Sequence, residues 1–449
     1  MHFDEALGYL LSLGHETLAL KLGLETTELL LKAIGDPQKS FPSVQIAGTN
    51  GKGSTAKVLE SIALAAGIRT GLFTSPHLID ITERIRINGQ DVSEDEFANL
   101  ATTVRESAEQ LIGSGRLTAP PTFFEQVTAI ALLGFKQENI ELAILETGLG
   151  GRLDSTTVAR ADTIGITQIA LDHQEYLGNT LTEIAAEKAA IIRSGVTAVI
   201  APQAPAALDV ILKRCESVGV QPLVNECEAR ILTTGKGGRM LVTFETKHDT
   251  YPLIQPGLLG RHQVTNVSLA IQLAESLRER GFHIDREAII EGVKRVVHRG
   301  RLELIEGQPQ LLFDGAHNPA GALALRAYLD EFVARPLTMV FGAMREKNLE
   351  EMAQLLFPRA HRLILTKPDN PRAMDVETLQ KLASNLIGEQ RVFAETSTEE
   401  AMRIALAETP DDGLICVTGS LYMIGEIQKF LVREGPDKNR WFANLRLRH

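Results

Sequence analysis

The stretch 48-GTNGKGS combines glycines, a lysine and a serine at spacings that suit phosphate binding. It stands between a β-branched run and an amphipathic segment, which predicts a strand, a tight turn and a helix. Backbone N–H groups in such a turn form a concave anion site, and the helix N-terminus adds partial positive charge. Lys52 can reach the β- and γ-phosphates of a nucleotide, and Ser54 can offer its hydroxyl to Mg²⁺. The full G-x-x-x-x-G-K-[ST] spacing is not met, because Ile46 occupies the first glycine position; the alternative is a glycine turn that binds no phosphate.

A second glycine-rich stretch, 146-ETGLGGRLDST, follows the apolar run 141-ELAIL directly. Glu146 therefore stands at the carboxyl end of a predicted strand, where open α/β sheets place their ligands. A carboxylate there suits Mg²⁺, and Arg152 and Asp154 on the same loop could contact a substrate. The alternative reading of Glu146 is an ordinary charge at a strand end.

The third stretch is 172-DHQEYLG, which follows the predicted strand 163-TIGITQ. A lone histidine such as His173 is more often structural than a ligand. Here, acidic and imidazole groups occur at the ends of neighbouring strands, which favours a metal-binding role for His173.

Most of the chain alternates short β-branched runs with helical stretches, the pattern of α/β layers over a parallel sheet. The predicted strands of the first part are 43–48, 69–74, 141–146, 163–168 and 197–201, with helices at 52–67, 122–137, 262–280 and 285–297. The stretch 238–254 predicts two antiparallel strands at a sheet edge. The rhythm restarts after Arg299-Gly300-Arg301, with strands at 302–315, 337–343, 361–366 and 413–419 and a helix from Pro319. We therefore expect two domains, 1–297 and 298–449.

Composition excludes several classes of protein. The 449 residues are 44% hydrophobic and 23% charged, which excludes a disordered, collagen-like or coiled-coil chain. The net charge of −11 argues against a general nucleic-acid binder. No apolar run is long enough to span a bilayer, the N-terminus lacks a basic n-region, and three scattered cysteines fit no disulfide framework. These features predict a soluble cytoplasmic protein with no membrane or nucleic-acid partner. The C-terminal segment 440-RWFANLRLRH is expected to pack Trp441 on the surface.

Taken together, the ordered motifs resemble those of the folylpolyglutamate synthase/dihydrofolate synthase family, within the Mur ligase superfamily. The motifs are AGTNGKGS, SPHLIDITERIRING (75–89), ETGLGGRLDST, LDHQEYLGNTLTEIAAEKAAI (171–191), GRHQVTN (260–266), DGAHNPAG (314–321) and TGSLYMIGE (418–426). They cover the chain from about Val44 to Glu426. Two residues depart from the family pattern: Thr157 stands where Asn is usual, and Arg299 where Pro commonly precedes Gly-Arg. Both put local loop geometry in doubt and leave the ligands in place.

The resemblance implies a large N-terminal P-loop ATPase-type domain with a mostly parallel sheet and a smaller Rossmann-like C-terminal α/β domain. It also implies ATP-dependent amide formation. A pteroate or folate carboxylate attacks the γ-phosphate, and the amine of L-glutamate then attacks the resulting acyl phosphate. Phosphoryl transfer of this kind needs its anions neutralised, which assigns Lys52 and a metal ion to the phosphates. ATP and Mg²⁺ are the implied cofactors, with K⁺ as a further cation.

The resemblance assigns site residues in three groups. The ATP-binding residues are Gly48, Thr49, Asn50, Gly51, Lys52, Gly53, Ser54, Asn266, Arg301 and Asp314. The metal ligands are Ser54, Ser75, Glu146 and His173. The substrate-binding residues are Thr122, Phe124, Arg152, Asp154, His317 and Ser420, of which His317 and Ser420 match positions for glutamate. Alternative roles for these last two are helix-terminal: His317 before the helix that Asn318-Pro319 opens, and Ser420 as a cap.

Catalytic roles are implied for Lys52, Lys188 and His317. In the superfamily, the lysine at the position of Lys188 is commonly carbamylated by CO₂, which requires a neutral amine that burial could supply. The alternative is a helix lysine paired with nearby glutamates. For a bound pterin, Phe124 could supply an apolar wall, and Thr122 and Asp154 its hydrogen-bond partners. One of Phe123 and Phe124 is expected to fill the core instead.

We therefore predict a monomeric bifunctional ligase whose substrates are dihydropteroate, reduced folates and L-glutamate. The alternatives are a folylpolyglutamate synthase only, another Mur-type amide ligase, or a nucleotide-binding switch without catalysis. Intact Glu146, His173, Lys188 and His317 weigh against a switch, because a switch needs no site for an amino-acid acceptor.

Overall fold

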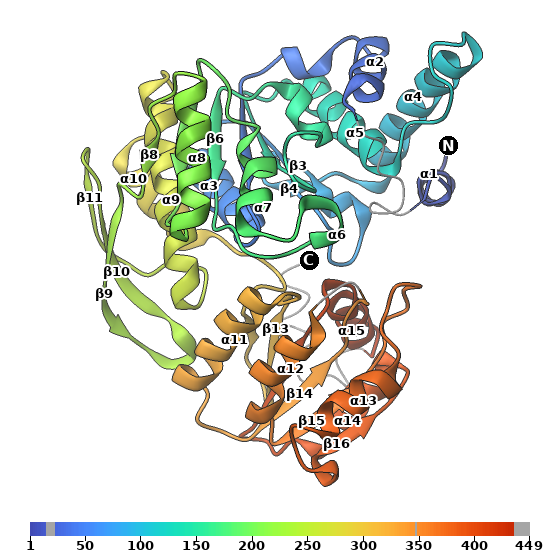
Figure 1. The fold of residues 1–449 in the computed structure, drawn as a ribbon, viewed down its shortest axis with the longest axis vertical. Helices are drawn as coiled ribbons and strands as arrows, with labels where there is room; N and C mark the ends of the chain where they lie inside the picture. The colour runs from blue at the N-terminus through green and yellow to red at the C-terminus, as the bar shows by residue number, and fades with distance from the viewer. Residues whose placement is uncertain (15–22, 346–347, 435–449) are drawn as a thin grey trace.

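The chain forms a large N-terminal α/β domain and a smaller C-terminal α/β domain, seen at the top and bottom of Figure 1. The structure is a computed structural model that describes residues 1–14, 23–345 and 348–434. The tail with Trp441 lies outside the described residues. In both domains β-branched and apolar runs form buried strands, as the alternation predicts.

The large domain is built on an eight-stranded sheet, counted over the described residues, in the order β4-β3-β2-β5-β1-β6-β7-β8. Its strands are β1 (Ser43–Ala47), β2 (Thr70–Phe73), β3 (Ile85–Ile87), β4 (Gln90–Asp91), β5 (Leu142–Glu146), β6 (Thr163–Ile166), β7 (Thr197–Ile200) and β8 (Leu223–Val224). Strands β2, β5, β1, β6, β7 and β8 run parallel, and β3 and β4 are antiparallel additions at one edge. β1 therefore lies between β5 and β6, so the loops that follow these three strands meet.

Helices cover both faces of the large sheet. On one face, α3 (Lys52–Ala65) packs against α9 (Arg261–Glu279) and α10 (Arg286–Arg295) in one apolar core. On the other, α5 (Phe123–Gln137) packs against α4 (Glu94–Gly113) in a second core, and Phe123 is buried there as expected. The other helices of this domain are α1 (Phe3–Ser12), α2 (Glu25–Ala33), α6 (Gln174–Leu177), α7 (Leu181–Ala189) and α8 (Pro205–Ser217).

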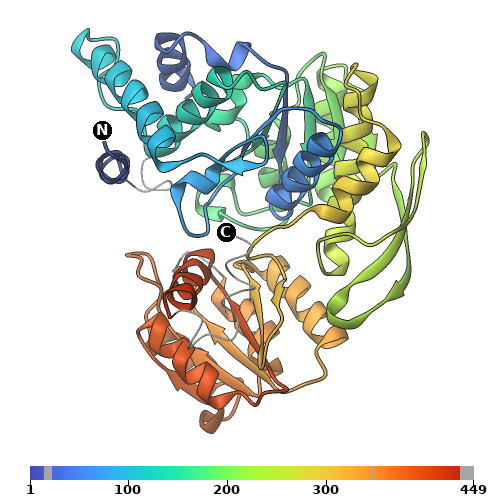
Figure 2. The ribbon, with the colours of Figure 1, turned by 180° about the vertical axis from the view of Figure 1, so that it is seen from behind.

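The stretch 238–254 forms a pair of antiparallel strands that reaches a sheet edge, as predicted, but in a sheet separate from the main one. Strands β9 (Glu228–Thr234), β10 (Met240–Glu245) and β11 (Thr250–Ile254) make a separate antiparallel sheet. The inward side chains of this sheet pack on α9, and its strands form no backbone hydrogen bonds with the described strands of the main sheet. The turn between β9 and β10 reaches the small domain, where the Tyr328 hydroxyl donates to the Gly237 carbonyl at 2.8 Å. Figure 2 shows this sheet running along one side of the molecule toward the small domain.

The small domain is a six-stranded sheet, over the residues described, in the order β12-β13-β17-β14-β15-β16. Its strands are β12 (Glu303–Ile305), β13 (Gln310–Asp314), β14 (Leu337–Phe341), β15 (Arg362–Leu365), β16 (Val392–Ala394) and β17 (Leu414–Thr418). All are parallel except β12. Its helices are α11 (Pro319–Phe332), α12 (Leu349–Leu356), α13 (Val376–Ser384), α14 (Thr398–Glu408) and α15 (Leu421–Arg433).

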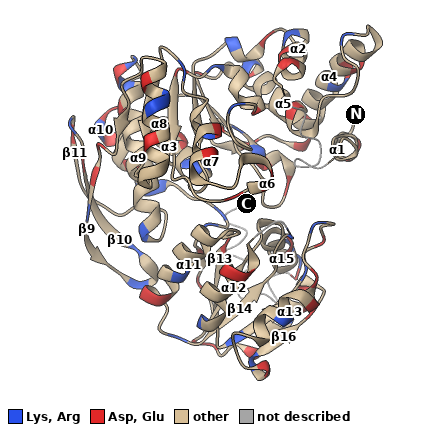
Figure 3. Ribbon diagram, in the orientation of Figure 1, with Lys and Arg blue, Asp and Glu red and all other residues tan. Residues whose placement is uncertain are grey.

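No helix in the described part of the chain combines the length and the apolar character needed to cross a lipid bilayer. Basic and acidic residues are both scattered over the helices of the two domains (Figure 3).

Candidate functional site

A cavity of about 420 Å³ opens between the two domains. The large domain lines it with the loops that follow β1, β2, β5 and β6, and the small domain with the loops that follow β13 and β17. The carboxyl ends of both parallel sheets thus face one space, which is where α/β sheets bind ligands. All the predicted site residues line this cavity except Arg152.

The glycine-rich loop between β1 and α3 is fixed by the neighbouring loop after β6. The backbone N–H groups of Thr49 and Asn50 donate to the Gln168 carbonyl at 3.0 and 3.3 Å. Gly51 has a φ of +90°, and a Cβ there would lie 2.2 Å from Asn266 Oδ1. Asn266 of α9 therefore lies directly against the loop. Only glycine tolerates both this close contact and the positive φ.

Lys188 lies on α7, behind the same loop. Its ammonium group donates to the Gly48 carbonyl at 2.8 Å, and the side chain is 5% exposed. Burial, together with the positive charge of Lys52, lowers the pKa of Lys188 from 10.5 to about 7. A large fraction of this amine is therefore neutral near pH 7. The alternative of a helix lysine paired with nearby glutamates is wrong, because the amine bonds the Gly48 carbonyl instead.

Glu146 ends β5 beside the start of α3. Its Oε2 accepts the Ser75 backbone N–H at 3.1 Å, and the residue is 6% exposed. A Cβ on Gly53 would lie 3.2 Å from that same oxygen. Burial raises the pKa of Glu146, and within the described residues no basic side chain pairs with it.

These residues suit a hard cation, because a buried carboxylate and the hydroxyls of Ser54 and Ser75 offer oxygen ligands at the phosphate loop. A cation would also give the buried Glu146 carboxylate a positively charged partner. Among the residues described, no three His, Cys, Asp or Glu side chains gather as a metal site by themselves. Phosphate oxygens, serine hydroxyls or water molecules must therefore complete any coordination shell here.

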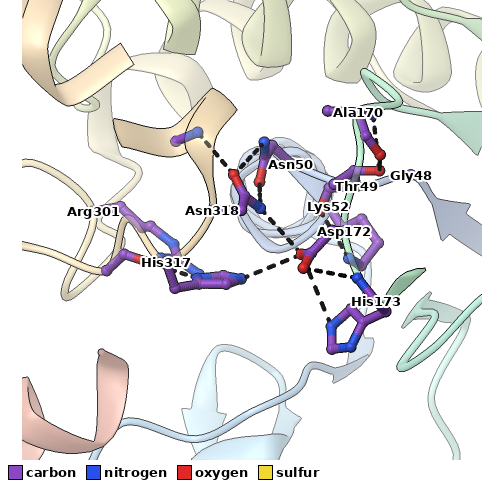
Figure 4. Close-up of polar contacts among 12 residues, drawn as sticks. Gly48, Thr49, Asn50, Lys52, Ala170, Asp172, His173, Arg301, His317 and Asn318 are labelled. Carbon is purple, nitrogen blue, oxygen red and sulfur yellow. Dashed lines mark hydrogen bonds and ion pairs between the residues drawn. The ribbon is translucent and has the colours of Figure 1, made fainter. Parts of the chain in front are cut away.

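Asp172 stands at the centre of an interdomain cluster that the sequence reading did not single out (Figure 4). Its Oδ2 accepts from Asn318 Nδ2 at 3.1 Å and lies 3.7 Å from His317 Nε2 and 3.9 Å from His173 Nε2. Asn318 and Asn50 exchange amide hydrogen bonds at 3.0 and 3.2 Å. The signal was available, because Asp172 and Asn318 lie in motifs already recognised, each next to a predicted ligand.

On the small-domain side, Arg301 and Asp314 shape the loop after β13. Asp314 is 7% exposed and accepts the backbone N–H groups of Leu302 and Ala316 at 2.9 and 3.0 Å. Arg301 Nη1 donates to the Gly315 carbonyl at 3.0 Å. Burial raises the pKa of Asp314, and Arg301 opposes that shift.

Ser420 and His317 differ in how their polar atoms are used. Ser420 precedes α15 but its side chain makes no capping bond, and its hydroxyl is buried with no hydrogen-bond partner among the described residues. The capping alternative for Ser420 is therefore wrong, and the residue lines the cavity. His317 Nδ1 lies 2.8 Å from the Gly315 carbonyl, which fixes the ring with Nε2 toward Asp172. Asn318, not His317, caps α11.

The proposed pterin residues lie at the other end of the cavity. The Phe124 ring packs on Phe73, with centroids 5.8 Å apart, and one side lines the cavity. The Thr122 hydroxyl caps α5 by accepting the Glu125 N–H, and Asp154 accepts the N–H groups of Leu149 and Thr156. Thr122 and Asp154 thus already hold local structure.

Arg152 lies away from the cavity. Its side chain is 59% exposed and pairs with Glu187 at 2.8 Å. Because the loop after β5 turns its side chain outward, Arg152 contacts α7 instead of the cavity.

The glutamate ligase domain of Mur ligases matches residues 300–421, and the Mur ligase middle domain matches residues 46–274. The chain is 35% identical, over 95% of its length, to a probable bifunctional folylpolyglutamate synthase/dihydropteroate synthase of Halobacterium salinarum, and covers 51% of that protein. The chain thus spans about half the length of that relative. It is 34% identical to the dihydrofolate synthase/folylpolyglutamate synthase of Bacillus subtilis, covering 93% of this chain and 97% of that one.

Solved structures agree. The Mycobacterium tuberculosis folylpolyglutamate synthase complexed with ADP superposes with a TM-score of 0.89 at 30% identity, over 95% of this chain and 97% of that one. Escherichia coli FolC in complex with DHPP and ADP gives 0.85 at 28% identity, covering 97% and 99%. The bifunctional Yersinia pestis enzyme complexed with AMPPNP and a Mn ion gives 0.82 at 28% identity, covering 96% and 98%. The chain therefore belongs to the folylpolyglutamate synthase/dihydrofolate synthase family of Mur ligases.

Proposed function

We propose that the protein is an ATP-dependent ligase that adds L-glutamate to dihydropteroate and to the γ-carboxyl of reduced folates through an acyl phosphate. The observation that carries this proposal is the shared cavity. A phosphate-binding loop lies on one of its walls, and an unpartnered serine hydroxyl lies on the opposite wall. A ligase needs this arrangement, because it must hold a nucleotide and an amino-acid acceptor on either side of one carboxylate.

In the first step a carboxylate oxygen of the substrate attacks the γ-phosphorus of ATP, and the bond to ADP breaks. The loop amides and Lys52 offset the charge of the β- and γ-phosphates, while Asn266, Arg301 and Asp314 hold the rest of the nucleotide. Ser54, Ser75, Glu146 and His173 would hold Mg²⁺, which supplies further charge neutralisation when bound. The Mn ion with AMPPNP in the related Yersinia pestis structure supports a divalent cation here. K⁺ stays a prediction.

In the second step the amine of glutamate attacks the acyl carbonyl carbon, and the tetrahedral adduct expels phosphate. Ser420 and His317 bind this glutamate, since one offers an unpartnered hydroxyl and the other a fixed imidazole. Enclosure between two domains keeps water from the acyl phosphate.

Lys188 is proposed to carry a carbamate formed from CO₂. Its low pKa supplies the neutral amine that the reaction needs. The carbamate would place a negative charge beside the phosphate loop and the cation, where an ammonium would oppose the cation.

For the pterin ring, Phe124 offers the apolar wall, with Thr122 and Asp154 nearby. The DHPP complex of the related FolC and the bifunctional name of the Bacillus subtilis relative support dihydropteroate as a substrate alongside folates. Arg152 is not part of this proposed substrate site, because its side chain pairs with Glu187 outside the cavity.

The deciding experiment measures ADP release with dihydropteroate or a reduced folate, each with and without glutamate. We expect glutamate-dependent turnover with both. If the reduced folate reacts with glutamate but dihydropteroate does not, the function is that of a folylpolyglutamate synthase only. No turnover with either substrate would indicate another Mur-type ligase. Where both react, Phe124→Ala should impair the dihydropteroate reaction more. The domain division at residue 298, a monomeric state and a cytoplasmic location stay predictions.

A further inference from the structure

The Ser54 hydroxyl contacts a histidine from a distant part of the chain. Ser54 Oγ lies 3.1 Å from Nδ1 of His298, and Ser54 itself is 3% exposed and lines the cavity. His298 follows α10 in the connection between the domains. It is not among the described residues that line the cavity. It therefore lies behind the cavity wall, in contact with Ser54.

The packing around Gly53 places this histidine close to Glu146. A Cβ on Gly53 would lie 3.2 Å from His298 Cε1 and 3.2 Å from Glu146 Oε2. The imidazole and the carboxylate thus lie against the same residue, one position before Ser54. His298 is held next to the oxygen atoms that suit a cation, without facing the ligand space itself.

The chemistry of a serine ligand gives this contact a purpose. A hydroxyl has one proton and two lone pairs. When the oxygen binds a cation, the positive charge repels the hydroxyl proton, which then needs an acceptor on the far side. His298 Nδ1 is at hydrogen-bond distance and accepts that proton when the ring carries its own proton on Nε2.

We propose that His298 is a positioning residue that holds the Ser54 hydroxyl with its oxygen lone pairs turned toward the nucleotide-bound cation. This inference rests on the proposed function, since it assumes that Ser54 meets a cation and nucleotide phosphates. Three residues later in the same connection, Arg301 lines the cavity. The interdomain connection therefore serves the nucleotide site at two points.

The test compares His298→Leu with His298→Asn, because the asparagine Oδ1 can replace Nδ1 as an acceptor whereas leucine cannot. Binding of AMPPNP to the full chain is measured by calorimetry with and without Mg²⁺. Mg²⁺ should increase the affinity for AMPPNP by a factor that is roughly tenfold smaller in His298→Leu than in the unaltered protein. Losses of this size are typical when a residue behind a metal ligand is removed. Affinity without metal should stay the same, and His298→Asn should keep the gain within about threefold. The Mn²⁺ affinity of the AMPPNP complex, followed by electron paramagnetic resonance, should fall in parallel.

A double variant separates this role from general packing. Ser54→Ala should remove the same gain, and adding His298→Leu to it should cost nothing more. A full Mg²⁺ gain in His298→Leu, an equal loss without metal, or additive losses in the double variant would each overturn the proposal. If the unaltered protein shows no Mg²⁺-dependent gain at all, the proposed function fails first and this inference with it.

Discussion

On the large-domain side of the cavity the polar groups are held by other protein groups, whereas on the small-domain side one key hydroxyl has no partner. The glycine-rich loop is fixed by the Gln168 carbonyl, and Lys188 by the Gly48 carbonyl. Ser420, by contrast, keeps a buried hydroxyl for which the described part of the chain offers no hydrogen-bond partner. The first wall is thus prepared before a ligand arrives, and the second depends on the ligand to complete its hydrogen bonds.

The largest effect should follow from breaking the prepared wall at Gly51. Gly51→Ala forces a side chain into a φ of +90° and against Asn266, so the loop amides must move. We expect kcat/KM for ATP to fall on the order of a thousandfold. Gly67→Ala is the matched control, since Gly67 has a φ of +77° with no atom within 4 Å of an added Cβ. A comparable loss in that control would show that left-handed strain alone, not the loop, is responsible.

Lys188→Met should give the next largest effect, a loss of roughly a hundredfold in kcat/KM. In the unaltered enzyme, removal of CO₂ should lower activity and bicarbonate should restore it. Because the pKa is about 7, this dependence should strengthen as pH rises through 7, where the amine becomes neutral. Lys57→Met is the control: it removes a partly buried lysine, whose pKa desolvation lowers to about 8 and which does not line the cavity.

The low pKa of Lys188 can also be tested through the stability of the protein. Its folded pKa lies below the ordinary value of 10.5, so the unfolded chain binds more protons between about pH 7 and 10.5. The free energy of unfolding should therefore rise with pH across that window, and Lys188→Met should flatten the rise. Full activity in CO₂-free buffer would contradict the carbamate while leaving this stability slope in place.

Ser420→Ala should sharpen the contrast between the walls. The KM for glutamate should rise roughly tenfold with KM for ATP unchanged, while the loss of an unsatisfied buried group should raise the free energy of unfolding by about 1 kcal/mol. His317→Ala should also raise the glutamate KM, and Arg301→Ala the ATP KM.

Thr418→Val provides the matched control for Ser420. Thr418 carries another buried hydroxyl without a partner, but it does not line the cavity. The control should gain stability without any change in KM. Equal losses of ATP and glutamate affinity in Ser420→Ala would remove Ser420 from the acceptor site.

The smallest effect concerns the contact between the β9–β10 turn and α11. Tyr328→Phe removes the 2.8 Å hydrogen bond to the Gly237 carbonyl and should lower the free energy of unfolding by about 1 kcal/mol. Both KM values should be unchanged, as measured by steady-state kinetics alongside urea denaturation. A change in either KM would mean that this contact helps to set the spacing of the two walls.

The sequence predicted well what depends on local pattern. The buried runs became β1, β5 and β6, and the glycine-rich loop lies between strand and helix. Order in space was not predictable in the same way, because strand pairing joins residues far apart in the chain. The position of β1 between β5 and β6 brings Glu146 to Gly53, and packing of the connection after α10 brings His298 to Ser54.

The sequence pattern also did not predict the direction in which each loop side chain points. Arg152 and Asp154 share a loop, yet one points to solvent and the other is buried, because the loop folds around the Asp154 carboxylate. Asp172 and Asn318 lie in motifs that the sequence did indicate, but residue spacing does not predict that their side chains meet across the two domains.

The amide pair between Asn50 and Asn318 bears on how the protein ages. Asn50 precedes Gly51, and an asparagine before glycine loses its side-chain ammonia more readily than others, because the following nitrogen can attack it. Conversion to aspartate would replace a donor with a second negative charge near Asp172, on the wall that receives phosphates. While the domains are together, two hydrogen bonds hold the Asn50 amide in one orientation and so slow this attack. The chemical stability of the phosphate loop thereby depends on a contact made by the small domain.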